Sequence, residues 1–470
     1  MSRAPTGNDP AYRTVRAGQW LLQLVIVAAA LWLVVQGSAR AVIIAALGPV
    51  AFGPFSYARL RLQRWLAPGP APSSPVDSAA QPRRPAPHAV PTTAARAWAV
   101  AVVGLSLDAL MAVQLLTART HDPWPALHGP GVTWVGPVWF SANALLALGC
   151  LGAALARGVG GVARWLVHRV RRTPATPPQP DLGRRQFVQQ LGMLSVGTPF
   201  VVSLTGVRTS YDFRVQEHAI VLPSWPRHLD GLRVAHLSDI HVGGAMDRRR
   251  LLQVAALTNA ARPDLVLHTG DFLTHRQGAF DQPLYEALAQ VHAPLGQWAC
   301  LGNHDFDDPP RLVRQLADAG VRTLRDEVAT LRVGGAPLDI AGLDYVFRGT
   351  ATPDHFARRM RRWPSREDTP RLLMNHDPST FAALPPACAD LVCSGHTHGG
   401  HVGIQLGPTR AVTVVGLLGL PDQGLFVRDD LRLFVTRCVG FYGYPMRLGI
   451  PPEIALLTLR APAADRASAE

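Results

Sequence analysis

The sequence predicts an α/β domain in the second half of the chain, preceded by an all-α transmembrane helical region. Hydrophobic residues make up 48% of the 470 residues and charged residues 17%, and the long apolar stretches fall before about residue 210. Beyond that point, short β-rich runs alternate with helical patterns and end in polar loops. A chain of this length exceeds one compact core, so at least two structural regions are expected.

Four apolar runs occupy residues 19–36, 41–57, 97–117 and 134–155. Three of them are long enough to cross a bilayer. The second is short and contains two Gly-Pro pairs, which favours a kinked span or a re-entrant element. We therefore predict a four-helix transmembrane region over residues 19–156, after a cytoplasmic tail of residues 1–18.

The loops between these runs differ in positive charge. The loop after the second run is rich in arginine, and its Pro/Arg-rich part, residues 66–95, is predicted to be disordered. The next loop is poor in arginine, whereas the linker of residues 157–186 is basic again, so the two arginine-rich segments are expected in the cytoplasm. The net charge of +13 is interpreted as a whole-protein enrichment in arginine, part of which lies in short loops that set the topology. No arginine stripe with interleaved aromatics indicates a nucleic-acid partner.

A fifth hydrophobic segment, residues 187–207, follows Arg184 and Arg185 directly. The run RRQFVQQLG is typical of a twin-arginine signal, and an ordinary fifth span after positive-inside arginines is an equal alternative. Both interpretations place the following domain on the outer, periplasmic face of an inner or plasma membrane. A segment lying on the inner surface would leave the domain on the cytoplasmic face.

Asp108 and the five cysteines are interpreted as structural residues. Asp108 lies inside the third apolar run, where a hydrogen bond within a helix bundle is favoured over a transport path. The five cysteines form no CxxC pair, which favours buried thiols, with two disulfides as the alternative in an oxidising compartment.

Polar residues recur where predicted strands end in the second half. The strand of residues 232–238 leads into Asp239 and His241, and the following strands, 264–269 and 297–301, lead into Asp271 and Asn303. Each step from Asp239 to Asp271 to Asn303 is 32 residues, the length of a strand-helix-strand unit, with helices expected over 247–261 and 282–291. Such side chains gather at the carboxyl ends of strands, where α/β sheets place their sites.

Three further strands are expected at residues 338–343, 371–375 and 390–394. His376 follows the second of these, and His396 and His398 follow the third. Carboxylate and amide oxygens together with imidazoles suit a hard or borderline divalent ion, such as manganese, iron, zinc or magnesium.

The ordered motifs DxH, GD, GNHD, H and GHxH resemble those of the calcineurin-like metallophosphoesterases over roughly residues 233–460. The resemblance implies a four-layer αββα sandwich, here residues 211–462, followed by a disordered tail of residues 463–470. It implies two divalent metal ions, with manganese favoured. The implied ligands are Asp239, His241 and His398 for one metal, Asn303, His376 and His396 for the other, and Asp271 as the bridge.

The resemblance also assigns a catalytic role to His304, which would stabilise or protonate the leaving oxygen. In some family members an Asp three residues after the bridging Asp orients this histidine, but here that position is Thr274. His401 stands where near relatives have glutamine, and it is interpreted equally as a substrate contact or a surface residue.

The C-terminal run VGFYGYPMR, followed by Pro452, Glu453 and Ile454, resembles the membrane-associated, twin-arginine branch of that superfamily, the YkuE/YaeI-like phosphodiesterases. Arg447 is interpreted either as a contact to an anionic substrate group or as a salt bridge at a sheet edge. The branch includes hydrolases of UDP-diacylglucosamine, so the expected activity is hydrolysis of a phosphoester on a lipid-linked or envelope substrate.

Two alternatives are a non-catalytic membrane sensor or scaffold, and a transporter with an appended metallophosphoesterase-like domain. A sensor is expected to lack some metal ligands, and here every position is filled. A transporter needs charged or polar residues along its path, and the apolar runs offer chiefly Asp108. The expected partners are therefore a phosphoester substrate and the bilayer.

Overall fold

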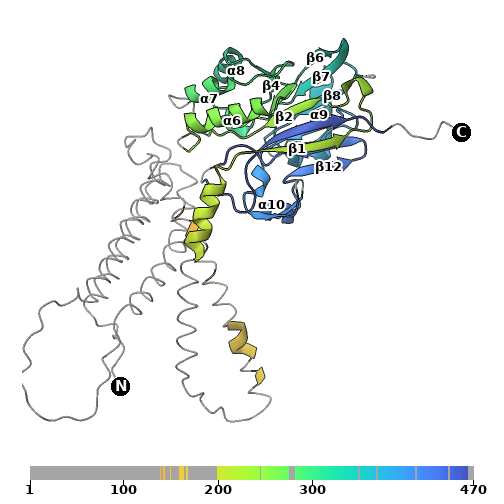
Figure 1. Cartoon of the computed structure of the whole chain (residues 1–470). Coiled ribbons are helices and arrows are strands. Elements are labelled where there is room, and N and C mark those ends of the chain that lie inside the picture. Colours follow the sequence, from red (N-terminus) through yellow and green to blue (C-terminus); the bar gives the residue numbers. More distant parts are fainter. Residues whose placement is uncertain are drawn as a thin grey trace, which may run out of the picture. The chain divides into compact units, whose positions relative to one another are not determined.

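A computed structural model of the chain describes residues 198–463, apart from residues 244, 275–280, 348–349, 367–368, 408–409 and 443–444, together with isolated helical residues between 138 and 167 (Figure 1). The chain divides into two compact units, residues 1–204 and 205–470. The apolar runs at 19–36, 41–57 and 97–117, the loop at 66–95 and most of the fourth run lie outside the described residues. Within the described ranges, no helix has the length and hydrophobicity needed to cross a bilayer.

The second unit contains two six-stranded sheets. The first sheet has the order β1-β14-β2-β3-β4-β5, and its strands β2, β3, β4 and β5 are parallel. Its strands are β1 (Arg214–Val221), β14 (Glu453–Arg460), β2 (Arg233–Leu237), β3 (Leu265–His268), β4 (Gln297–Ala299) and β5 (Val321–Thr323). The last strand of the chain thus lies between the first two, parallel to β1 and antiparallel to β2.

The second sheet has the order β12-β13-β9-β8-β7-β6, with β7, β8, β9 and β13 parallel. Its strands are β12 (Gly424–Arg428), β13 (Leu431–Val435), β9 (Leu391–Ser394), β8 (Arg371–Met374), β7 (Ala336–Gly342) and β6 (Glu327–Val333). Short runs such as β3, β8 and β9 are buried throughout, as expected of parallel strands that are covered on both faces.

Three hydrophobic clusters lie among the helices and the two sheets, and the mixed α/β class predicted for this part of the chain is confirmed. One cluster packs α6 (Arg248–Ala260), α7 (Gln282–Leu288) and α8 (Pro309–Asp318) on the outer face of the first sheet, and these helices stand together on one flank of the domain in Figure 1. A second cluster lies between the sheets. The third covers the outer face of the second sheet with α9 (Pro353–Met360).

Two of the three helices on the first sheet, α6 and α8, begin at an aspartate that caps them. The Asp247 carboxylate accepts a hydrogen bond from the N–H of Arg250 at the start of α6, and Asp308 accepts one from Arg311 at the start of α8. The helix predicted over 247–261 is confirmed within one residue. The helix predicted over 282–291 ends earlier, at Leu288, and the chain then turns towards β4.

A small β-hairpin follows the GHxH motif of residues 395–398. Strands β10 (Gly403–Gln405) and β11 (Ala411–Thr413) pair antiparallel, and the short helix α10 (Val414–Leu417) comes directly after them. The cysteines at 300, 388, 393 and 438 are free buried thiols, as the sequence favoured.

Candidate metal centre

The predicted ligand residues come together where parallel strands of both sheets end. Asp239 and His241 follow β2, and Asp271 and Asn303 follow β3 and β4 of the first sheet. The three remaining histidines follow β8 and β9 of the second sheet: His376, His396 and His398. All seven residues predicted as ligands therefore line one edge of the sandwich.

Two clusters share Asp271. In the first, Asp239, His241 and Asp271 offer ligand atoms within 4.8 Å of one another, and His398 Nε2 lies 3.2 Å from Asp239 Oδ1. The His241 Nε2 atom lies 3.7 Å from Asp239 Oδ1 and 3.6 Å from Asp271 Oδ2. These distances leave room for one cation among oxygen and imidazole ligands.

The second cluster contains Asp271, His376 and His396, again within 4.8 Å of one another. His376 Nε2 lies 3.3 Å from Asp271 Oδ2, 3.2 Å from Asn303 Oδ1 and 3.1 Å from His396 Nδ1. Asp271 thus faces both clusters, in the way that a bridging carboxylate does.

Backbone carbonyls orient three of the imidazoles. The Nδ1–H of His376 donates to Thr269 O at 2.6 Å, that of His241 to Leu273 O at 3.3 Å, and that of His398 to Gly440 O at 3.4 Å. Because a donating Nδ1 carries the proton, the Nε2 lone pair of each ring is directed into the cluster.

Hydrogen bonds hold one carboxylate oxygen of Asp239 and leave the other oxygen able to bind a cation. Its Oδ2 accepts hydrogen bonds from Ser238 Oγ at 2.5 Å and the His396 N–H at 2.9 Å, and Cys438 Sγ lies 3.1 Å away. Its Oδ1 and His241 Nε2 are buried and have no hydrogen-bond partner among the described residues. Two buried polar atoms that face each other without partners fit a cation between them.

The charges of the cluster also favour a cation. Burial by itself disfavours a charged imidazole, but the Asp271 and Asp239 carboxylates outweigh it and raise the pKa of His376 to about 10. Burial likewise raises the pKa of Asp239, but His398 and His376 lower it well below its ordinary value. The site thus concentrates negative charge that attracts protons or metal ions.

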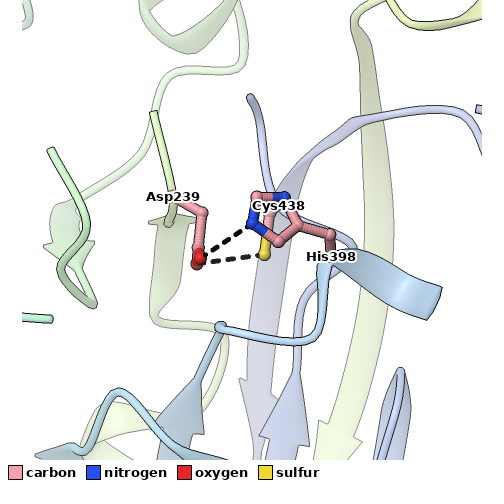
Figure 2. Close-up of side chains that lie close together, drawn as sticks. All are labelled: Asp239, His398 and Cys438. Carbon is pink, nitrogen blue, oxygen red and sulfur yellow. Dashed lines mark hydrogen bonds and ion pairs between the residues drawn. The ribbon is translucent and has the colours of Figure 1, made fainter. Parts of the chain in front are cut away.

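Cys438 is a member of the cluster that the sequence did not predict. It follows β13, is fully buried, and joins Asp239 and His398 in a third group of close ligand atoms (Figure 2). Burial raises the pKa of its thiol well above the ordinary value. A neutral S–H that donates to Asp239 is therefore its state in this arrangement, and only the tertiary structure reveals it.

Asp305, the last residue of the GNHD motif, is a second residue whose role the sequence did not identify. Its buried carboxylate accepts hydrogen bonds from the N–H groups of Asp271 at 2.7 Å, Phe272 at 3.0 Å, Leu273 at 3.3 Å and Gly302 at 2.9 Å. One side chain thereby joins the loops that carry Asp271 and Asn303. In the sequence, only its position two residues after the predicted ligand Asn303 could have indicated this role.

His304 lies beside the clusters. Its backbone N–H donates to Asp271 Oδ1 at 2.8 Å, and its ring centre is 4.5 Å from that of Tyr442 and 5.2 Å from that of His241. Burial lowers the pKa of the ring to about 4. The Thr274 hydroxyl donates to His241 O at 2.9 Å, and the rings of Tyr442 and His241 are the aromatic neighbours of His304.

Arg447 lies in a loop and forms no salt bridge among the residues that the structure describes. Its side chain is fully buried, and it donates to the backbone carbonyls of His398 at 3.0 Å and Gly440. It therefore joins the loops that carry His398 and Cys438. His401 is half-buried, with Nδ1 3.1 Å from Met446 O, so it also supports a loop instead of lying free on the surface.

Comparison with known proteins agrees with this geometry. Residues 232–400 match the family model described as calcineurin-like phosphoesterase. The chain is 28% identical over 289 residues to an uncharacterized metallophosphoesterase, YkuE of Bacillus subtilis, covering 60% of this chain and 98% of that protein. It is 26% identical over 296 residues to the UDP-2,3-diacylglucosamine pyrophosphatase LpxG of Chlamydia trachomatis, covering 50% of this chain and 86% of that protein.

A third relative is the transmembrane protein with metallophosphoesterase domain of Danio rerio, which is 30% identical over 268 residues. That match covers 53% of this chain and 57% of that protein. The family model and these relatives support a calcineurin-like phosphoesterase domain in the second half of the chain, and the protein is a hydrolase that acts on phosphoester bonds.

Proposed function

We propose that the protein hydrolyses a phosphodiester, phosphomonoester or pyrophosphate with two divalent metal ions bound between its sheets. The observation that carries this proposal is the sharing of Asp271 by two clusters of buried ligand atoms. A pair of cations at such a site supplies activation of water and neutralisation of phosphoryl charge.

In this proposal Asp271 bridges the metals, and manganese is the favoured ion. One metal is held by Asp239, His241 and His398, and the other by Asn303, His376 and His396. The mixture of carboxylate, amide and imidazole ligands supports manganese, iron, zinc or magnesium at both positions.

The remaining chemistry falls to His304, which stabilises or protonates the leaving oxygen. Its hydrogen bond to Asp271 and its contact with Tyr442 support this role, because they hold the ring next to both clusters without making it a member of either.

The proposed substrate is a lipid-linked or envelope phosphoester, such as a UDP-diacylglucosamine-like compound. The name of the Chlamydia relative supports this substrate class. The apolar runs before residue 210 support membrane association, and the distribution of arginines supports a domain on the outer face.

The test is hydrolysis of bis-p-nitrophenyl phosphate and p-nitrophenyl phosphate by the purified full-length protein with added Mn²⁺. We expect metal-dependent activity that falls by about 100-fold or more in Asp271→Asn, because the shared ligand is lost, and by a similar factor in His304→Ala. Metal content should fall in Asp271→Asn and stay unchanged in His304→Ala.

Matched controls are Asp318→Asn and His292→Ala, which change exposed residues away from the clusters. They should keep full activity. Wild-type protein that is folded and loaded with metal yet hydrolyses neither compound would contradict a general phosphodiesterase. Equal activity with and without metal would contradict the two-metal site.

A further inference from the structure

Exposed aliphatic side chains are concentrated in one short segment, residues 402–420. Five of them are more than half exposed: Ile404, Leu406, Val414, Leu417 and Leu418, with 78% for Leu417 and 74% for Leu418. Elsewhere in the described part of residues 205–463, only Val221, Phe347 and Val427 reach that level, and they are scattered. We call the exposed side chains of residues 402–420 the apolar face.

The hairpin register explains why these side chains point outward together. Ile404 pairs with Val412, so both lie on the same side of the hairpin, and both are exposed. The neighbouring pair, Gly403 and Thr413, lies on the opposite side, where Thr413 is buried and donates to Asp422 Oδ2 at 2.5 Å. The helix α10 that follows buries none of its residues.

The apolar face is attached directly to the loop that carries His396 and His398. A Cβ on Gly400 would lie 2.7 Å from Thr413 Oγ1, and Thr397 Oγ1 donates to Asp422 O at 2.7 Å. The hairpin therefore packs against the metal-centre loop with its inner side, and its outer side carries the aliphatic residues.

The same face lies next to the point where the fifth hydrophobic segment enters the domain. The N–H of Arg447 donates to Gly206 O at 3.1 Å, and the carbonyl of the next residue, Leu448, accepts from the Gly403 N–H at 3.0 Å. The loop that contains Arg447 and Leu448 is therefore hydrogen-bonded both to the end of the apolar segment 187–207 and to the start of the hairpin. In Figure 1, α10 is at the end of the domain away from α8.

We propose that the apolar face docks on the surface of a lipid bilayer and holds the metal centre there. Residues 402–420 contain no Asp or Glu and one basic residue, Arg410, which suits an interface of acyl chains and anionic headgroups. Residues 447 and 448 contact both Gly206, at the end of the hydrophobic segment, and the start of the hairpin, so a bilayer that meets the chain at Gly206 would lie beside this face. Delivery of a lipid-linked phosphoester to the site is the part of this inference that rests on the proposed function.

The test places an environment-sensitive fluorophore at Leu417→Cys in the full-length protein, with Cys150→Ala as background. The four other cysteines are buried, so labelling is confined to the new thiol. The protein is reconstituted with vesicles of phosphatidylethanolamine and phosphatidylglycerol, with or without brominated lipid. Val221→Cys, on exposed strand β1, is the matched control.

We expect brominated lipid to quench the label at residue 417 and aqueous iodide to quench the label at residue 221. Quenching of both labels by iodide alone would overturn the docking. Protection of residue 417 from both quenchers would also overturn it, because the face would then be covered by protein, either another part of this chain or a second copy. Neither readout depends on enzymatic activity.

A second experiment tests delivery of substrate with the triple variant Ile404→Ser, Leu417→Ser and Leu418→Ser. We expect unchanged hydrolysis of bis-p-nitrophenyl phosphate and about a tenfold slower hydrolysis of a phosphodiester anchored in vesicles. Equal rates on the anchored substrate would contradict delivery. If wild-type protein hydrolyses neither compound, the proposed function fails while the quenching experiment still decides the docking.

Discussion

Five of the candidate metal ligands hold their backbone at positive φ, where residues other than glycine are disfavoured. Asp239, His241, Asp271, His396 and His398 have φ between 49° and 66°. Each such conformation costs about 1–3 kcal/mol and persists only where the surrounding contacts determine it. Here the Asp305 carboxylate binds the N–H of Asp271, and the carbonyls of Leu273 and Gly440 bind the imidazoles of His241 and His398.

Glu453 is the residue whose charge should matter most for stability away from the ligands. Its carboxylate is buried and pairs with Arg437 Nη2 at 2.7 Å, and it also accepts from the Arg437 N–H at 2.8 Å. Burial by itself raises the pKa of Glu453, but His218, whose Nε2 lies 3.5 Å from the carboxylate, and the charge of Arg437 outweigh it, so the pKa is lowered.

We therefore expect Glu453→Gln to lower the free energy of unfolding at pH 7 by about 3 kcal/mol or more, because it leaves Arg437 buried without its counter-ion. A lowered folded-state pKa contributes stability that is present above the ordinary value of 4.5 and lost as the pH falls through the folded value. The difference in the free energy of unfolding between wild type and Glu453→Gln should become smaller below about pH 4.5. Urea denaturation at several pH values measures it.

Glu217→Gln is the matched control, because that carboxylate is exposed and lies 3.9 Å from Arg233. Its unfolding should resemble that of wild type at every pH. A Glu453→Gln protein as stable as the control at pH 7 would show that the buried pair contributes nothing.

At the scale of elements, the loops that follow the strands can pack closely against one another because glycines occupy the points of contact. A Cβ on Gly395, after β9, would lie 2.0 Å from Ser238 Oγ and 2.3 Å from Asp239 Oδ2. A Cβ on Gly302, after β4, would lie 2.2 Å from Asp271 Oδ1. These glycines bring loops from different strands, and from different sheets, into direct contact at the ligands.

Gly395→Ala is therefore expected to displace Asp239 and lower kcat/KM by about 100-fold or more, since a shift near 1 Å at a catalytic group has effects of that size. Bound metal, measured by elemental analysis, should fall with it. Gly407→Ala is the control, because a Cβ at Gly407 meets nothing within 4 Å. A fully active Gly395→Ala enzyme would mean that the close packing of β9 against Asp239 is not required.

At the scale of the whole molecule, the metal centre connects the two sheets. Asp239 and Asp271 follow strands of the first sheet, and His376 and His398 follow strands of the second. Direct contacts already cross between the sheets here, such as the hydrogen bond from His376 to Thr269 O at 2.6 Å. Cations bound to both sides would stabilise the packing of one sheet on the other.

Removing metal should therefore lower Tm. At a metal concentration 100 times Kd the stabilisation is about 2.7 kcal/mol. For a domain of this size that corresponds to a shift of about 5–10 °C. Differential scanning fluorimetry with chelator and with Mn²⁺ measures the shift, and Asp271→Asn should show little of it. An unchanged Tm in wild-type protein at saturating metal would contradict binding across the two sheets.

The sequence by itself determined the α/β class of the second half, the strands that end in candidate ligands, and seven of the residues that meet at the candidate centre. These are local features, because hydrophobic runs form strands and the residues after parallel strands share one edge of a sheet. The same reasoning placed helix α6 within one residue. It placed the end of α7 three residues too late, since the turn towards β4 depends on tertiary contacts.

Tertiary structure alone decided what approaches those ligands from distant parts of the chain. Cys438 lies 199 residues from the Asp239 carboxylate it contacts, and Arg447 is surrounded by carbonyls that no sequence pattern identifies. The outward direction of the apolar face likewise depends on hairpin register and on Thr413 being drawn inward by Asp422. These contacts depend on which strands, far apart in the sequence, become neighbours in the sheets. Local hydrophobic patterns do not identify those neighbours.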